Sequence, residues 1–106
     1  MKKLIIAAFI ATASFNTMAG KDIATSSVNY VYQPDLAPTE FEFNASVANS
    51  CGSSLYRVKS NEVETANRKF AIVLAAFASG KSLAFHDKEQ CEGSRSLVSW
   101  VRIKNN

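Results

Sequence analysis

Residues 61–80 read NEVETANRKFAIVLAAFASG, and this stretch contains the strongest structural signal in the chain. Asn61 followed by Glu64 matches a capping box at a helix start, and Gly80 is a typical residue just past a helix end. The spacing predicts a helix over about 62–79. Apolar residues recur along it at helical intervals and predict a core-facing side, which comprises Val63, Ala66, Phe70, Val73, Leu74 and Phe77.

A second side of the same helix is also apolar. Residues 70–78 are nine consecutive apolar residues, and a helix that is apolar all round is usually covered all round. One hypothesis is that a neighbouring subunit covers the small side, formed by Ile72, Ala75, Ala76 and Ser79. The alternative is that alanine, the best helix former, simply tolerates exposure.

The segments on either side of the helix favour strands. We expect them at 28–32, 40–47, 55–59, 82–86 and 97–104, with a polar turn region at 87–95. In the second of these segments, Phe41 and Phe43 alternate with Glu40 and Glu42, which is typical of a half-buried strand. The order predicts an α+β fold in which a small curved antiparallel sheet packs on one helix.

Cys51 and Cys91 are the two cysteines of the chain. Their separation excludes a CxxC redox motif, and two cysteines are too few for a structural zinc site. We therefore predict one disulfide, closing a loop of about 41 residues.

The N-terminus indicates export. Lys2 and Lys3 precede an apolar run at 4–13, and small residues follow up to Ala19. This pattern predicts a signal peptide over 1–19 and a single exported domain over 20–106. The apolar run is shorter than the roughly 20 residues needed to span a bilayer, so we expect a periplasmic or secreted protein without membrane insertion after signal removal.

Charge narrows the range of partners. The whole chain carries a formal net charge of +3. Removal of Lys2 and Lys3 with the signal peptide would leave a net charge near +1. The remaining basic residues are scattered, whereas nucleic-acid binding requires a basic patch. We therefore expect a protein or glycan partner and no nucleic acid.

Candidate ligand contacts lie near the cysteines and in the last strand. Tyr56 and Trp100 offer flat rings and Arg95 offers hydrogen-bond donors, although the same residues are also common in ordinary strands and loops. His86 precedes Asp87, but successive strand residues point to opposite faces, which makes them a poor catalytic pair. No catalytic residue, metal ligand or cofactor site is predicted, and we expect a protein that is not an enzyme.

The run RKFAIVLAAFASGK at 68–81, followed by SLAF at 82–85, a cysteine and WVRI at 100–103, resembles a recurring layout. It resembles short uncharacterised exported proteins of Gram-negative bacteria and is more distantly similar to the OB-fold B subunits of AB5 toxins. The likeness covers about residues 51–103. It implies an OB-like barrel, a ring-shaped homo-oligomer and glycan binding, but no glycan-binding residue corresponds position by position.

Together these observations predict a small exported binding module, an oligomeric surface-recognition or glycan-recognition subunit. The alternative is a monomeric periplasmic accessory or inhibitor protein that docks on one envelope protein. A small hydrolase is the least favoured class.

Overall fold

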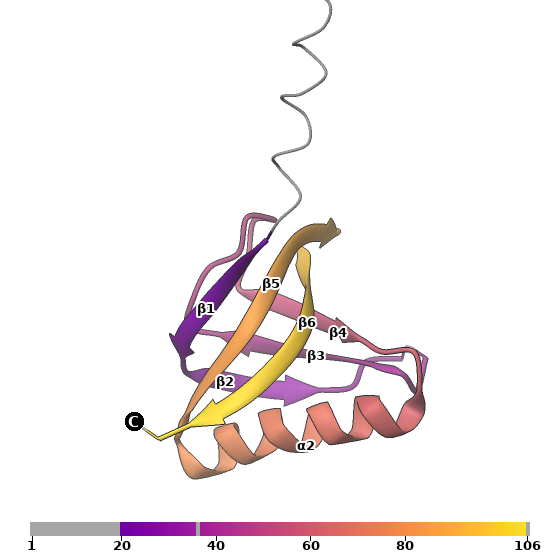
Figure 1. The fold of residues 1–106 in the computed structure, drawn as a ribbon. Helices are drawn as coiled ribbons and strands as arrows, with labels where there is room; N and C mark the ends of the chain where they lie inside the picture. The colour runs from indigo at the N-terminus through magenta and orange to yellow at the C-terminus, as the bar shows by residue number, and fades with distance from the viewer. Residues whose placement is uncertain (1–19, 36, 106) are drawn as a thin grey trace, which may run out of the picture.

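The computed structural model describes residues 20–35 and 37–105, and the predicted signal peptide at 1–19 lies outside this part of the chain. The described residues form one helix and six strands (Figure 1). These elements are β1 (Lys21–Ser26), β2 (Val28–Tyr32), β3 (Glu40–Ala45), β4 (Leu55–Lys59), α2 (Val63–Ser79), β5 (Ser82–Glu92) and β6 (Arg95–Lys104). The prediction of an α+β fold with a sheet packed on a single helix is confirmed.

The strands form one mixed sheet in the order β1-β5-β6-β4-β3-β2. Neighbouring strands are antiparallel except for β4 and β6, which run parallel. This parallel pair departs from the predicted antiparallel sheet. Parallel neighbours need a long connection between them, and here α2 and β5 together supply it. In Figure 1, β5 and β6 run steeply across β2, β3 and β4, and α2 lies along the lower end of the sheet.

The two edges of the sheet meet at Ser27. β1 and β2 stand at opposite ends of the strand order, yet Ser27 alone separates them in the chain. No ladder between them is present among the described residues, so the sheet is not closed. Ser46 bridges the point where they diverge: its Oγ lies 3.1 Å from Ser26 Oγ and accepts a hydrogen bond from the Ser27 amide at 3.0 Å. β1 and β2 therefore remain the two edges of an open sheet.

Aromatic rings from three strands form the centre of the core. Phe43 of β3 stacks on Tyr56 of β4 with ring centroids 5.5 Å apart. Phe85 of β5 meets both rings edge-on, at 5.2 and 4.7 Å. All three side chains are fully buried, and such aromatic contacts add stability beyond the area they bury. At the rim, Phe70 of α2 meets Phe41 of β3 edge-on at 5.2 Å.

The helix occupies the predicted range but buries a different side. Leu74 and Phe77 were expected in the core, yet they are 42% and 45% exposed, and Val63 is 46% exposed. The fully buried helix positions are Ala66, Val73 and Ala76. Ala76 faces the sheet, and because successive residues of a helix point about 100° apart, Phe77 is directed outward.

The predicted end of the helix is confirmed, whereas the predicted cap at its start is not. Gly80 ends the helix in a left-handed conformation with φ of 73°, as expected. At the start, Glu62 is the N-cap residue and makes no side-chain capping bond. The predicted capping box of Asn61 and Glu64 is therefore not formed. No helix among the described residues is long and apolar enough to cross a membrane.

Two stretches that were not predicted as strands belong to strands. The polar segment Lys21–Ser26 forms β1, and β5 continues through the predicted turn region as far as Glu92. The pairing register of β5 shifts between Asp87 and Cys91, and Glu89 adopts a left-handed conformation there. The Glu89 amide donates to Asp87 Oδ1 at 2.8 Å. A bulge of this kind lets a strand continue through a polar sequence.

The predicted disulfide between Cys51 and Cys91 is present. It joins the β3–β4 connection to the far end of β5. The side chain of Asn49 organises the same loop: its Oδ1 accepts from the Cys51 amide at 2.7 Å, and its Nδ2 donates to the carbonyls of Leu55 and Ser94 at 2.7 and 3.0 Å. The bridge therefore fastens a loop that is already bonded to both neighbouring segments.

Replacing both cysteines by alanine should lower the free energy of unfolding by about 2–4 kcal/mol, because the unfolded chain regains the entropy of a long closed loop. Denaturant titration with and without a thiol reductant measures this loss. The wild type should respond to the reductant and the double variant should not. An unchanged unfolding midpoint in the double variant would show that the bridge has no stabilising role.

Candidate functional site

A buried carboxylate lies at the centre of the most elaborate polar cluster in the described chain. Strand alternation directs Phe41 and Phe43 into the core and Glu42 to the opposite face of β3. Glu42 is nonetheless 0% exposed. The sheet register explains this burial, because Tyr32 of β2, Glu42 and Arg57 of β4 stand directly beside one another.

Three donors surround the carboxylate of Glu42. Arg57 donates from Nε at 2.6 Å and from Nη2 at 2.5 Å, both to Oε2. The Nε of Arg95 lies 3.1 Å from Oε1, and the hydroxyl of Tyr32 donates to the same oxygen. A buried carboxylate with hydrogen bonds on both oxygens is the condition under which burying a charge is tolerated.

A second carboxylate extends the cluster toward the end of β5. Glu92 Oε1 accepts from Arg57 Nη1 and Oε2 accepts from Lys59 Nζ, each at 2.8 Å. Arg57 therefore links the buried Glu42 to the partly exposed Glu92. Since Glu92 adjoins Cys91, the disulfide and the ion pairs hold the same end of the sheet.

These contacts shift the pKa values of the charged groups. Burial alone raises the pKa of Glu42, but hydrogen bonds from Tyr32, Arg57 and Arg95 outweigh it and bring the pKa below its ordinary value. Hydrogen bonds from Lys59 and Arg57 lower the pKa of Glu92. Both carboxylates are therefore ionised at neutral pH.

The exposed part of the cluster consists of rings and cationic side chains. Tyr30 precedes Tyr32 by two residues, which places both rings on one side of β2 with centroids 5.8 Å apart. Tyr30 is 47% exposed, and the Arg95 side chain is 33% exposed. We call Tyr30, Tyr32, Glu42, Arg57 and Arg95 the Tyr–Arg face. It presents a flat ring beside guanidinium donors whose positions are fixed by a buried anion.

The three predicted ligand contacts do not lie together. Tyr56 is fully buried and donates its hydroxyl to the Val47 carbonyl at 2.9 Å, so its prediction as a ligand contact is wrong. Burial, followed by the charge of Asp87, raises the pKa of Tyr56 to about 12. Arg95 belongs to the Tyr–Arg face, and Trp100 lies further along β6.

The predicted interface residues also separate. Ala76 is buried in the core and Ile72 packs against it, so their placement on an outward side is wrong. Ala75 and Ser79 are exposed, and the Ser79 hydroxyl donates back to the Ala75 carbonyl at 2.7 Å. The outward apolar side of α2 is instead formed by Leu74 and Phe77 together with Ala71, Ala75 and Ala78.

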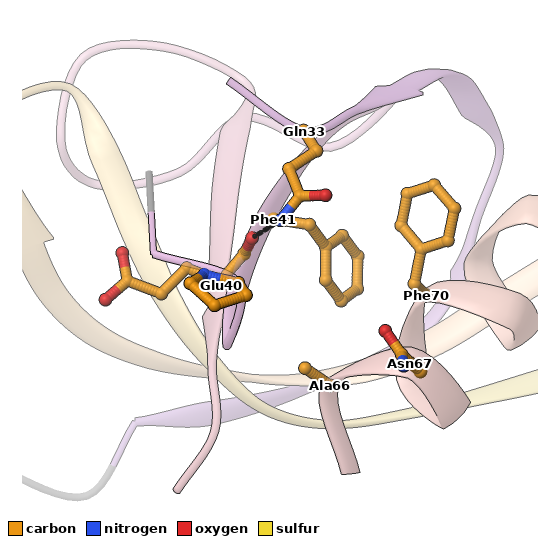
Figure 2. A pocket seen from close by; sticks show the side chains of 7 residues that line it. Gln33, Glu40, Phe41, Ala66, Asn67 and Phe70 are labelled. Atoms are coloured by element: carbon orange, nitrogen blue, oxygen red, sulfur yellow. Dashed lines mark hydrogen bonds between the residues drawn. The ribbon is translucent and has the colours of Figure 1, made fainter. Parts of the chain in front are cut away.

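A shallow pocket of about 170 Å³ lies between the β2–β3 connection and α2 (Figure 2). Phe41 and Phe70, whose rings meet edge-on, both line it, while the Glu40 side chain points away from both rings. Gln33 closes one side by donating to the Glu40 carbonyl at 3.0 Å. The pocket and the Tyr–Arg face thus lie on opposite sides of β3. No cluster of residues suited to hold a metal ion is found in the described ranges.

Replacing Glu42 by glutamine should lower the free energy of unfolding at pH 7 by about 2–3 kcal/mol. The variant leaves Arg95 without a counter-charge and Arg57 with Glu92 alone, and the contact of both guanidinium groups with water keeps the loss at or below the low end of the roughly 3–5 kcal/mol range for buried pairs. Glu40→Gln is a matched control on the same strand and should change the stability by less than about 0.5 kcal/mol.

The pH dependence of the free energy of unfolding should differ between Glu42→Gln and Glu40→Gln. Because the pKa of Glu42 is lower in the folded than in the unfolded protein, its contribution is complete above the ordinary value of 4.5 and is lost as the pH falls below it. Between about pH 5 and pH 3, the wild type and Glu40→Gln should lose more stability than Glu42→Gln. Equal losses in all three proteins would contradict this role of Glu42.

Known proteins give no guide to this site. No protein-family model, curated protein or solved structure matches the chain. The functional conclusion therefore depends on the geometry of the described residues.

Proposed function

We propose that this protein is a small exported binding module that recognises a glycan through the Tyr–Arg face and has no catalytic activity of its own. The observation that carries the proposal is the exposed Tyr30 ring beside Tyr32 and the Arg95 guanidinium. A sugar ring stacks its C–H face on an aromatic ring, and its hydroxyls accept hydrogen bonds from a planar guanidinium. The buried Glu42 holds that guanidinium in place before any ligand arrives.

The position of the face in the fold supports this proposal. With β1 and β2 counted as one bent strand, β3 and β4 become the second and third strands of an OB-like sheet. This is the surface that OB folds use to bind oligosaccharides and oligonucleotides, together with the neighbouring loops. Glu42 and Arg57 lie on these two strands, and Arg95 follows the β5–β6 turn. The scattered basic residues favour an oligosaccharide over a nucleic acid.

The disulfide supports the exported location. A bridge between Cys51 and Cys91 persists in oxidising compartments and is rare in the cytosol. It agrees with the signal peptide predicted from Lys2, Lys3 and the following apolar run. Export places the Tyr–Arg face where surface glycans occur.

The outward side of α2 supports assembly into an oligomer. Leu74 and Phe77 expose large apolar side chains next to each other on a helix turn. They are flanked by alanines, so the surface is apolar without a charged interruption along that side. Such patches mark interaction sites in soluble proteins. We place the subunit contact there. The alternative remains a monomer that uses this helix side to dock on one envelope protein.

Replacing Tyr30 by alanine should weaken glycan binding about tenfold, which corresponds to about 1.4 kcal/mol, because the sugar loses the ring on which it stacks. Tyr30→Phe keeps the ring and serves as the matched control, with binding close to that of the wild type. A glycan array followed by titration of the bound glycans measures both variants. The proposal fails if no glycan binds, or if Tyr30→Ala binds as well as the wild type.

The mass of the purified protein in solution tests the subunit contact. Light scattering on a sizing column should give a multiple of the subunit mass, and Phe77→Glu should reduce it to the monomer because a charge in an apolar interface is strongly unfavourable. Glu64→Lys, an exposed substitution on the same helix, is the control and should leave the mass unchanged. A monomeric wild type would favour the alternative with a single envelope partner.

A further inference from the structure

A second row of side chains crosses the sheet on strands β1, β5 and β6. It consists of Asp22, His86, Trp100 and Arg102, which we call the indole row. Their chain neighbours Ile23, Phe85 and Val101 are buried in the core. Strand alternation therefore directs the row to the outer face of the sheet.

Contacts within the row are continuous. Asp22 and His86 are register partners, and Asp22 Oδ1 lies 2.6 Å from His86 Nδ1. The His86 and Trp100 rings are nearly parallel, at 26°, with centroids 6.4 Å apart. The Arg102 guanidinium carbon lies 5.6 Å from the centre of the Trp100 ring, within the range of a cation–π contact.

The ends of the row retain unused hydrogen-bonding capacity. The Asp22 side chain is 68% exposed, and its contact with His86 within the described chain uses Oδ1. Arg102 is exposed and is not among the described ion pairs, although the chain offers several carboxylates. Trp100 itself is 37% exposed, which is unusual for the largest apolar side chain.

We propose that the indole row is a second ligand site, which binds a short neutral oligosaccharide across the strands. The exposed part of Trp100 supplies apolar contact area beside His86, Asp22 Oδ2 accepts hydrogen bonds from sugar hydroxyls, and Arg102 donates to sugar oxygens. From β1 to β6 the row crosses two strand spacings, about 10 Å, an extent that suits two linked sugar rings. Asp22 and Arg102 carry opposite charges at the two ends of the row, so the site favours a ligand without net charge. The row contains no aliphatic side chain of the kind that seats a peptide's apolar residues.

This site is separate from the Tyr–Arg face. Arg95 begins β6, whereas Trp100 and Arg102 lie in its second half, and the two clusters share no residue. The charges differ as well, since Lys59, Arg57 and Arg95 exceed Glu42 and Glu92 by one positive charge. Substitutions on one surface or the other can therefore show which of the two binds a given ligand.

Tryptophan fluorescence reports ligand binding at the indole row directly, because Trp100 is the only tryptophan of the chain. We would titrate the purified protein with cellobiose, lactose and N,N′-diacetylchitobiose, and probe an array of neutral oligosaccharides in parallel. A saturable change in Trp100 emission is expected with at least one neutral oligosaccharide. Asp22→Asn and Arg102→Met should each raise its dissociation constant about tenfold, the effect of losing a charge-assisted hydrogen bond. Glu64→Lys, an exposed substitution on α2 outside both surfaces, should leave it unchanged.

Three results would overturn the proposal. The first is the absence of any neutral oligosaccharide that binds to the folded protein. The second is binding that survives both Asp22→Asn and Arg102→Met, and the third is binding lost in Tyr30→Ala alone, which would place it on the Tyr–Arg face. Thermal unfolding of each variant, recorded in the same buffer, confirms that the protein compared is folded.

Discussion

The buried charge of Glu42 constrains the sheet more than any other single group. Burying a carboxylate away from water is costly unless it is paired and hydrogen-bonded, as Glu42 is on both oxygens. Here the donors come from β2, β4 and β6, so three strands must stand in one register relative to β3. A slip of one residue would turn the donors to the opposite face. The carboxylate thus specifies the strand alignment in a sheet whose short strands specify it weakly by themselves.

The same constraint has a functional consequence. A guanidinium on a long side chain normally loses rotamer entropy when it binds a ligand. In this protein the Nε of Arg95 is already held by Glu42, and Arg57 is held by Glu42 and Glu92 together. The remaining nitrogens of Arg95 are positioned by bonds that form during folding. The side chain therefore loses its rotamer entropy on folding and not on ligand binding. A binding surface on rigid strands is also more precise than one on loops, which favours the strand positions over the serine-rich loop near Cys51.

Local patterns predicted the elements well and their contacts poorly. The helix, its end at Gly80, the alternation of Glu40–Ala45 and the disulfide all follow from spacing and residue type within a short stretch. The strand β1 was missed because Lys21–Ser26 is polar and becomes a strand only by pairing with β5. The helix side was misassigned because Ala76 and Phe77 are both apolar, and periodicity does not say which of two neighbours faces a curved sheet.

The candidate site illustrates the same limit. Tyr30 and Tyr32 share a strand side, as do Glu40 and Glu42, and both facts are visible in the sequence. That Tyr32 stands beside Glu42, and Glu42 beside Arg57, depends on strand order and register, which the sequence leaves open. Tyr56 was misjudged for a related reason: a tyrosine with a buried ring still satisfies its hydroxyl through one backbone carbonyl, so its polarity gives no sign of exposure.

The two ligand surfaces and the outward side of α2 lie on different parts of one small sheet, and this arrangement favours weak sites used together. A shallow strand surface offers a few stacking contacts and hydrogen bonds, so each site alone supports modest affinity. Assembly through Leu74 and Phe77 would present several copies of both surfaces at a fixed spacing. Binding to a glycan-covered surface then gains from effective concentration, which raises the overall affinity without any new contact in a single subunit. The rigid anchoring of Arg95 by Glu42 serves this design, because simultaneous engagement requires that every copy present its donors in the same geometry.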